Sequence, residues 1–233
     1  MDSRIATVRR AVILAAGKAT RLGGENKLLV EAGGVPVARW HERLLRGIPT
    51  TVVTRTEDVK AVSEAVTWAK LVAHDELDGP VGALKAYRSM VRHPEEETLV
   101  IFADTLLVPQ PFPEGSWVGV APAPARVWDL PSPWGWTRGK PYLSVCVGIY
   151  AFDNARRLDD AIGLLTVGPD VPFAKLLHAY ALSSRLKENN VRGWHDAGDR
   201  DAISRVPDFE DALFEDPPAK NDVVGWVDVA LTR

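Results

Sequence analysis

Cysteine is nearly absent from this sequence: the 233 residues contain one, Cys146. An internal disulfide framework is therefore excluded, and a lone cysteine fits a reducing compartment. Cys146 lies in the apolar run "YLSVCVGIYAF" with no cationic neighbour to lower its pKa, which favours a structural role over a reactive thiol. A chain of this length can bury a substantial core without cross-links.

A strong net charge and long apolar runs are also lacking. The formal net charge is −3, so no basic field marks a nucleic-acid-binding protein. No apolar run reaches the roughly 18 residues that span a bilayer, and the start "MDSRIATVRR" has no apolar signal-peptide core. We therefore expect a cytoplasmic protein with neither nucleic acid nor a membrane among its partners. The sequence carries no signature of its oligomeric state.

Short apolar runs alternate with amphipathic segments from residue 11 to about residue 105. The run "AVILAA" predicts a buried strand, and "VPVARWHERLLRGI" has the apolar spacing of a helix that closes near Gly47. Further strands are predicted at 50–55, 70–75 and 98–104, and further helices at 58–69 and 79–91. This alternation predicts an α/β fold of three layers, with a mostly parallel sheet and helices on both faces.

The second half of the chain departs from this alternation. Residues 109–141 hold many prolines and four tryptophans with little periodicity, and we interpret them as a strand near "SWVGVAPA" followed by a long loop. A strand at 141–152, helices at 154–165 and 172–186, and a strand–turn–helix segment at 189–206 follow. We expect one domain over residues 9–206 and an acidic, Pro-containing C-terminal tail over residues 207–233.

The stretch "VILAAGKATRLGGENKLLV" places Lys18, Arg21 and Lys27 on a glycine-dotted segment directly after the first predicted strand. Open α/β sheets bind ligands at the carboxyl ends of their strands. Glycines let a phosphate approach the backbone, and cations neutralise its charge. The spacing matches neither GxxxxGK[ST] nor GxGxxG. The alternative is a surface loop with solvated cations.

The same residues resemble the signature loop of nucleotidyltransferases with a GT-A-like Rossmann fold. This superfamily includes sugar-phosphate nucleotidyltransferases and the molybdenum-cofactor guanylyl- and cytidylyltransferases. The short step from Arg21 to Lys27 is most similar to the molybdenum-cofactor branch. Two positions depart from the pattern: Ala19 replaces a common glycine, and Asn26 replaces a common proline. The pattern L-A-[AG]-G-x-x-x-R-[LM], followed by a lysine and leucines, matches Leu14, Ala15, Ala16, Gly17, Arg21, Leu22, Lys27, Leu28 and Leu29.

Two later segments resemble the nucleotide side of that superfamily. "DGPVGALKAY" is similar to the segment beside the base, with Gly79 and Gly82 at its small positions. "LVIFADTLL" is similar to the strand that ends in a metal-binding aspartate, here Asp104. Ala103 stands where a glycine is usual, a mild departure.

Two further segments resemble its acceptor side. "VGIYAF" is similar to the strand N-A-G-I-Y-x-F of sugar nucleotidyltransferases, which implies acceptor contacts from Gly148 and Tyr150, although Val147 replaces a small residue. "GWHDAGD" resembles G-x-W-x-D-x-G-[TD], which implies a second metal ligand, Asp196. The similarity therefore spans residues 11–205.

The resemblance implies transfer of NMP from an NTP to a phosphorylated acceptor, most readily a sugar phosphate, with release of pyrophosphate. It implies catalytic roles for Arg21 and Lys27 and a Mg²⁺ cofactor on Asp104 and Asp196. Such reactions depend on positioning and charge neutralisation. The implied nucleotide-binding residues are Leu14, Ala15, Ala16, Gly17, Lys18, Gly79 and Gly82.

Plainer structural roles compete with several of these assignments. Asp104 could be a helix N-cap and Asp196 a turn acid. His195 would point away from Asp196 in a strand and is expected to be structural. Asp199 and Asp201 fit a helix start better than a metal site. The five histidines form no HxH or HxxxH pair, so no zinc site is predicted.

Alternative functions also remain open at this stage. Arg138 and Lys140 could bind an acceptor phosphate or be solvated, and the loop tryptophans could stack on a ligand or fill the core. A molybdenum-cofactor-type transferase and a non-catalytic nucleotide-sugar-binding module are the alternatives to a sugar-phosphate enzyme. A glycosyltransferase with a related sheet would normally carry Asp-x-Asp after a strand, which "FADTLL" lacks.

Overall fold

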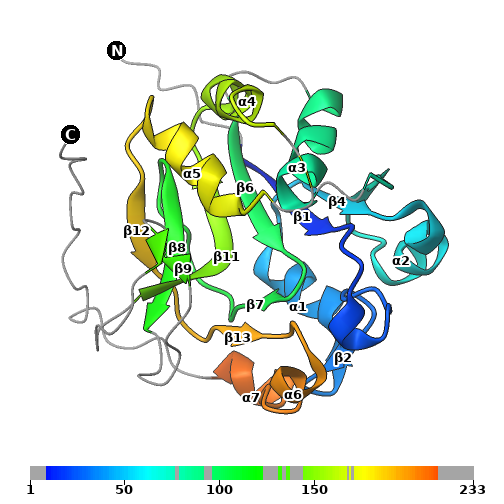
Figure 1. Cartoon of the computed structure of the whole chain (residues 1–233). Helices are drawn as coiled ribbons and strands as arrows, with labels where there is room; N and C mark the ends of the chain where they lie inside the picture. The colour runs from blue at the N-terminus through cyan, green and yellow to red at the C-terminus, as the bar shows by residue number, and fades with distance from the viewer. Residues whose placement is uncertain are drawn as a thin grey trace.

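The computed structural model describes residues 9–76, 79–91, 96–122, 131–132, 135–136, 144–166, 168 and 171–214. A seven-stranded sheet forms its centre (Figure 1). Six strands run parallel, and β11 runs antiparallel between β8 and β6. The predicted mostly parallel α/β sheet is therefore confirmed. In spatial order the strands are β12 (Lys187–Asn190), β8 (Trp117–Pro122), β11 (Ser144–Phe152), β6 (Glu97–Phe102), β1 (Arg9–Ala15), β4 (Thr50–Thr54) and β5 (Lys70–Ala73).

Helices cover both faces of this sheet, as three layers require. On one face lie α3 (Gly79–Met90), α4 (Ala155–Gly163) and α5 (Phe173–Ala181), which share a core cluster with the sheet side chains that point toward them. On the other face lie α1 (Val37–Leu44) and α2 (Val59–Ala65) (Figure 1). Alternate residues of β1 supply the two clusters, with Ile13 on the α1 side and Val12 on the α3 side.

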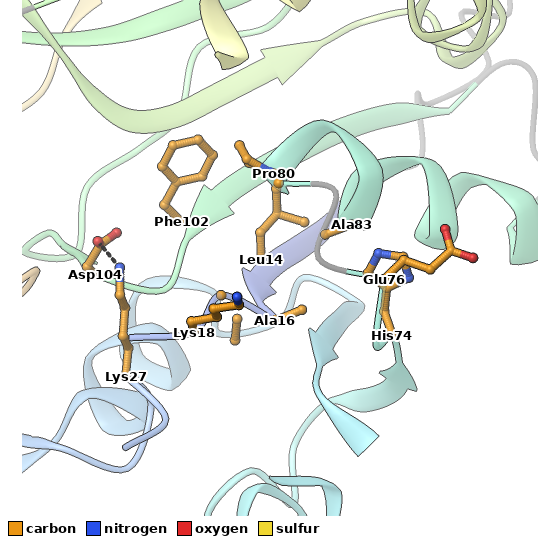
Figure 2. Close-up of a pocket in the computed structure, with 13 residues that line it drawn as sticks. Leu14, Ala16, Lys18, Lys27, His74, Glu76, Pro80, Ala83, Phe102 and Asp104 are labelled. Carbon is orange, nitrogen blue, oxygen red and sulfur yellow. Dashed lines mark hydrogen bonds and ion pairs between the residues drawn. The ribbon is translucent and has the colours of Figure 1, made fainter. Parts of the chain in front are cut away.

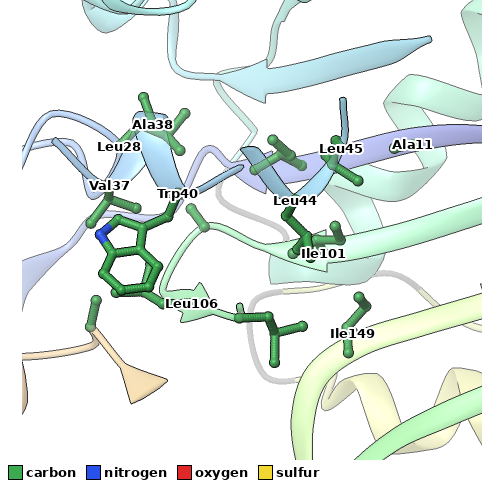
Figure 3. Close-up of a cluster of buried hydrophobic side chains, with 14 of the residues drawn as sticks. Ala11, Leu28, Val37, Ala38, Trp40, Leu44, Leu45, Ile101, Leu106 and Ile149 are labelled. Atoms are coloured by element: carbon green, nitrogen blue, oxygen red, sulfur yellow. The ribbon is translucent and has the colours of Figure 1, made fainter. Parts of the chain in front are cut away.

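The apolar layer under α1 is built around large side chains (Figure 3). Trp40 is 1% exposed, and its Nε1 donates to the carbonyl of Ala32 at 3.0 Å. Leu44 and Leu45 lie beside it in the same cluster and contribute to the core shared with Ile101 of β6. This layer fixes α1 against the part of the sheet whose strand ends carry the candidate site.

Short elements complete the described chain. They are η1 (Thr20–Leu22), η2 (Thr56–Asp58), α6 (Arg200–Ile203), α7 (Phe209–Phe214) and the strand pairs β2 (Glu31–Ala32) with β3 (Val35–Pro36), β7 (Thr105–Leu106) with β13 (His195–Asp196), and β9 (Pro131–Ser132) with β10 (Gly135–Trp136). None of the helices in the described part of the chain has the length and apolar character needed to cross a membrane.

Several helices are shorter than their apolar patterns. The pattern at 58–69 yields a helix only over Val59–Ala65, and Trp68, beyond its end, still packs against the core. The expected loop over 109–141 lies largely outside the described residues, including Trp128, Trp134, Arg138 and Lys140. Cys146 is half-buried in β11, where burial and then Glu188 raise the pKa of its thiol to about 12, in line with a structural role.

The predicted tail begins with residues that contact the domain. Phe209 is 3% exposed, its ring centroid lies 4.9 Å from that of Trp40, and its N–H donates to the carbonyl of Gly33 at 2.9 Å. Gly33 has φ of 59°, and a Cβ there would lie 2.2 Å from the carbonyl oxygen of Pro207. The tail is thus docked on the domain at Phe209, and residues 215–233 of the predicted tail lie outside the described residues.

Replacing Phe209 by Ala should test this docking. Loss of a buried aromatic ring from the Trp40 layer should lower the free energy of unfolding by about 3 kcal/mol, measured by urea denaturation. Glu210→Ala, which changes an exposed neighbour, should stay within about 0.5 kcal/mol of the wild type. Equal stability of the two variants would show that α7 does not contribute to the core.

Candidate functional site

The carboxyl ends of the parallel strands β1, β4, β5 and β6 meet at one edge of the sheet. A cavity of about 410 Å³ opens there (Figure 2). It extends from the loop after β1 to the N-terminus of α3 and to the end of β6. Its lining residues are Leu14, Ala15, Ala16, Gly17, Lys18, Lys27, His74, Glu76, Gly79, Pro80, Ala83, Phe102 and Asp104.

The lining includes most of the residues expected at a nucleotide site. Leu14 to Lys18 and Gly79 contribute to it, whereas Gly82 is buried in α3 and is not part of the lining. His74, Glu76 and Phe102 also line the cavity and were not expected from the sequence. Their positions in the sequence could have suggested this, because His74 and Phe102 lie near the ends of predicted strands and Glu76 directly follows one. Nucleotide-binding roles for these residues stay predictions.

The signature loop, defined here as residues 16–27, has a backbone suited to glycine. Ala19 has φ of 48°, in the left-handed region, and precedes the single turn of η1. Gly23 and Gly24 follow with φ of 76° and 89°. Ala19 therefore adopts a conformation that favours glycine, at the steric cost of a Cβ in the left-handed region.

Asn26 holds the end of the signature loop and is 2% exposed. Its Nδ2 lies 3.3 Å from the Ala15 carbonyl, 3.1 Å from Thr54 Oγ1 and 2.9 Å from Asp58 Oδ2. Its Oδ1 accepts from the N–H of Leu28 at 3.1 Å. These bonds join β1, β4 and η2 to the loop, so the side chain supplies the rigidity that a proline would supply through its ring.

A second tie comes from Arg55, whose side chain is 14% exposed. Its Nε donates to Asp58 Oδ2 at 2.7 Å, and its Nη2 donates to the carbonyl of Gly24 at 2.9 Å. Asp58 thus accepts from both Asn26 and Arg55. Lys27 directly follows Asn26. The hydrogen bonds of Asn26 and Arg55 therefore fix the backbone that leads into Lys27.

Lys27 forms an ion pair with Asp104 across the mouth of the cavity (Figure 2). Their side chains are 23% and 19% exposed, so water screens this pair less than a surface pair. Asp104 lies in the turn between β6 and β7, not at a helix N-cap. The pair joins the signature loop to the end of β6.

Asp196 is brought close to Asp104 by the short antiparallel pairing of β13 with β7. In the pairing of β13 with β7, Asp196 lies opposite Thr105, the residue after Asp104. The N–H of Ala197 donates to the Asp104 carbonyl at 2.9 Å. Two segments far apart in sequence therefore present their carboxylates side by side.

Gly198 marks the point where the charged side chains converge. A Cβ on Gly198 would lie 2.8 Å from Asp196 Oδ1, 3.3 Å from Arg21 Nη2 and 3.5 Å from Asp104 Oδ2. The N–H of Gly198 also donates to Asp196 Oδ1 at 2.7 Å. Only a glycine leaves this space to the three side chains. Sequence reasoning did not assign Gly198, although it lies in "GWHDAGD".

This cluster brings the cations Arg21 and Lys27 close to the acids Asp104 and Asp196, with Asp199 beside Arg21. Partial removal from water raises the pKa of Asp196, and the neighbouring Asp104 raises it further, while the Gly198 N–H and Arg21 oppose the shift. Arg21 is exposed, and its Nη1 lies 3.7 Å from Asp199 Oδ2. Added positive charge beside Asp196 would favour its ionised form.

The donor set fits a magnesium ion. Mg²⁺ takes oxygen ligands and usually keeps several waters and substrate phosphates. Both carboxylates approach one point, beside Gly198. The described residues offer no group of three or more His, Cys, Asp or Glu side chains placed to hold a metal, so Mg²⁺ would need water or phosphate oxygens beyond these two acids.

The two residues expected on the acceptor side are both enclosed. Gly148 has φ of 75°, and a Cβ there would lie 2.2 Å from Thr105 Oγ1, which donates to the Val147 carbonyl at 2.7 Å. Tyr150 is 4% exposed, with its ring centroid 4.6 Å from that of Phe173. Gly148 allows β11 to approach the turn that carries Asp104, and Tyr150 packs in the core. Acceptor contacts from both stay predictions.

The plainer roles weighed for neighbouring residues are visible in the structure. Asp199 is the N-cap of α6 and accepts from the N–H of Ala202 at 2.8 Å. Asp201 pairs with Arg205 on the surface. His195 packs edge-on against Trp40 with centroids 6.3 Å apart. These three residues have structural partners outside the charged cluster.

Comparisons with known proteins agree with this geometry. The family model of the MobA-like NTP transferase domain matches residues 11–128. A molybdenum cofactor guanylyltransferase of Pseudomonas paraeruginosa is 31% identical over 121 residues, or 51% of this chain and 60% of that protein. This chain therefore matches less than two thirds of the length of that curated relative.

Solved structures share the fold at low sequence identity. A Bacillus anthracis protein assigned as a glucose-1-phosphate thymidylyltransferase has a TM-score of 0.70 at 18% identity, covering 88% of this chain and 96% of that chain. The inositol-1-phosphate CTP transferase of T. maritima has a TM-score of 0.63 at 14% identity, covering 86% and 96%. The sheet and its helices are thus those of a nucleotidyltransferase fold.

Asn26→Asp should test whether the buried amide holds the signature loop. The change removes the donor to three acceptors and places a carboxylate beside Asp58, so it should lower the free energy of unfolding by about 2 kcal/mol. Denaturation measures the loss, and Glu25→Gln, at the exposed neighbouring position, is the control. If Asn26→Asp is as stable as Glu25→Gln, Asn26 does not hold the loop.

Proposed function

The chain belongs to the MobA-like NTP transferase domain family, and from this premise we propose that it transfers NMP from an NTP to a phosphorylated small-molecule acceptor with release of pyrophosphate. The observation that carries the proposal is the convergence of Arg21, Lys27, Asp104 and Asp196, of which Lys27 and Asp104 also line the cavity. This set supplies two cations for phosphates and two oxygen ligands for Mg²⁺.

The reaction joins two anions. An acceptor phosphate oxygen attacks the α-phosphorus of the NTP and forms a new P–O bond, while the bond from the α-phosphorus to the bridging oxygen breaks. Pyrophosphate leaves with that electron pair. Because both reactants are negatively charged, the protein must neutralise charge and align the reacting atoms.

In the proposed reaction the cavity would bind the nucleoside, and the charged cluster of Arg21, Lys27, Asp104 and Asp196 would bind the phosphates and Mg²⁺. The backbone of Ala15 to Gly17 and the Gly79–Pro80 end of α3 line the cavity and would enclose the nucleoside. Arg21 is suited to a two-pronged contact with triphosphate oxygens, and Lys27 to the α-phosphate as charge builds. A Mg²⁺ ion bound by Asp104 and Asp196 would neutralise triphosphate oxygens and orient the leaving group.

Lys27 must exchange partners for this role. In the free protein it is paired with Asp104. A triphosphate that takes Lys27 leaves the Asp104 carboxylate beside Asp196 without its cation, and Mg²⁺ would compensate both acids. Lys27 is therefore held at the reaction centre before the substrate arrives.

The acceptor belongs to one of two chemical classes. The motifs "VGIYAF" and "GWHDAGD" favour a sugar phosphate, as the sequence reasoning expected. The similarity to a molybdenum cofactor guanylyltransferase and the short Arg21–Lys27 spacing favour a phosphorylated pterin as a second candidate. A non-catalytic nucleotide-sugar-binding module would bind nucleotide but release no pyrophosphate.

A panel assay separates these functions. The purified chain is incubated with each NTP, with Mg²⁺, and with either sugar 1-phosphates or molybdopterin, and pyrophosphate is followed. Pyrophosphate that appears only with one acceptor class assigns that class. Nucleotide binding without pyrophosphate release in any combination would contradict the proposed enzyme and support a binding module.

Lys27→Ala should lower turnover by roughly 10²-fold or more because a positive charge beside the transferred phosphoryl group is lost. Pyrophosphate release under saturating NTP measures the effect. Lys60→Ala, at an exposed position of α2, should leave turnover unchanged. Near-normal turnover of folded Lys27→Ala would defeat the assignment of Lys27.

Asp104→Asn and Asp196→Asn should each reduce turnover sharply, and the double variant should be little worse than the poorer single one. Two ligands of one ion act as a unit, so their effects are not additive. The Mg²⁺ dependence of pyrophosphate release is measured in all three variants. Asp201→Asn, which changes a surface acid of α6, is the matched control, and full activity of Asp196→Asn would remove it as a ligand.

A further inference from the structure

His41 is a buried histidine on α1, on the opposite side of the Asp104 turn from the cavity. It is 1% exposed and lies in the layer that also contains Leu44 and Leu45. The sequence analysis found no metal-ligand spacing around it. A polar ring in an apolar layer needs a hydrogen-bonding partner, because burying a polar group without one is unfavourable.

The partner of His41 is the backbone of the candidate metal turn. His41 Nε2 lies 3.0 Å from the carbonyl oxygen of Ala103, the residue before Asp104. A carbonyl oxygen can only accept, so Nε2 carries the hydrogen and donates. Burial lowers the pKa of His41, and the Ala103 carbonyl and Asp104 oppose the shift without reversing it. The ring is therefore a neutral donor.

This hydrogen bond acts on the orientation of Asp104. The Ala103 carbonyl belongs to the planar peptide unit that ends at the Asp104 Cα. Fixing that plane limits the directions open to the Asp104 side chain. The Ala103 residue is 1% exposed, so water cannot readily replace a lost donor at its carbonyl.

Backbone bonds hold the same turn from two other directions. The N–H of Ala103 donates to the Leu14 carbonyl at 3.2 Å, and the Asp104 carbonyl accepts from Ala197 at 2.9 Å. The first bond joins the turn to β1, and the second joins it to the segment of Asp196. His41 adds a side-chain bond from the helix layer behind the sheet.

We propose that His41 is a positioning residue that holds the Ala103–Asp104 peptide so that the Asp104 carboxylate is aimed at the divalent cation. The proposal rests on the proposed function, in which Asp104 binds Mg²⁺. His41 touches neither the cavity lining nor the charged cluster in the contacts described above. Its effect should appear in metal dependence and not in nucleotide contacts.

Three variants separate positioning from simple loss of stability. His41→Leu removes the donor and keeps an apolar side chain. His41→Gln keeps an N–H donor at a similar reach. Leu44→Ala, in the same helix and the same apolar cluster, is destabilised by a cavity but keeps the bond to Ala103.

The first measurement is the Mg²⁺ concentration that gives half-maximal pyrophosphate release, together with Mg²⁺-dependent binding of a non-hydrolysable NTP analogue by calorimetry. His41→Leu should raise the half-saturating Mg²⁺ concentration about tenfold, which corresponds to about 1.4 kcal/mol. Its KM for NTP at saturating Mg²⁺ should change less than twofold.

His41→Gln should recover most of the shift in half-saturating Mg²⁺ concentration, and Leu44→Ala should show no such shift despite a lower Tm. An unchanged Mg²⁺ requirement in His41→Leu, or an equal shift in Leu44→Ala, would overturn the proposal.

The second measurement does not depend on catalysis. Amide hydrogen exchange of Ala103 and Ala197 reports the two backbone bonds of the turn, and it should accelerate in His41→Leu but not in His41→Gln. Unchanged exchange in His41→Leu overturns the positioning role even in a protein without transferase activity. A wild-type protein that neither releases pyrophosphate nor binds nucleotide with Mg²⁺ contradicts the proposed function instead, and the exchange data still decide whether His41 holds the turn.

Discussion

The ion pair between Lys27 and Asp104 is the contact on which the candidate site depends, because it joins the signature loop that follows β1 to the turn that follows β6 through their side chains. On one side, the buried Asn26 amide and the Arg55 guanidinium fix the loop that presents Lys27. On the other side, the β7–β13 ladder fixes Asp104 beside Asp196. Each partner is half-buried, so its position is determined by the backbone behind it and not by the long lysine side chain alone.

The sheet topology explains why these groups meet. Parallel strands place the ends of β1, β4, β5 and β6 at one edge, and the loops there carry the signature loop and Asp104. Asp196 does not belong to that sheet. After β12 the chain turns back and pairs His195 and Asp196 with β7, which places Asp196 beside Asp104. In this arrangement β11 passes close to Thr105 of β7. Gly148 makes this approach possible, since a Cβ at that position would overlap Thr105 Oγ1.

Much of this arrangement follows from sequence patterns, and the rest depends on contacts that leave no local pattern. Buried runs alternating with amphipathic helices predict the sheet and its active edge, and the first motif predicts which loop carries Lys27. The convergence at Gly198 is not predictable in this way, because it arises from a two-residue ladder between distant segments. His41 is likewise hidden, since a lone histidine in a helical pattern does not reveal its partner, the Ala103 carbonyl, far away in the sequence. Tyr150 is packed among aromatic side chains of the core, and the acceptor contact that its motif implies stays a prediction.

The two departures from the family pattern have different physical consequences. Ala19 retains a left-handed backbone conformation that favours glycine, so the loop keeps its shape and carries local strain. Asn26 replaces the fixed dihedral of a proline by a set of buried hydrogen bonds, and that set is useful only if every member is satisfied. Its Nδ2 and Oδ1 both have partners, and its acceptor Asp58 is itself paired with Arg55. The loop is therefore rigid at the residue next to Lys27 and strained near its tip. Buried hydrogen bonds thus hold the chain directly beside Lys27, whereas the strained backbone of Ala19 lies between Lys18 and Arg21.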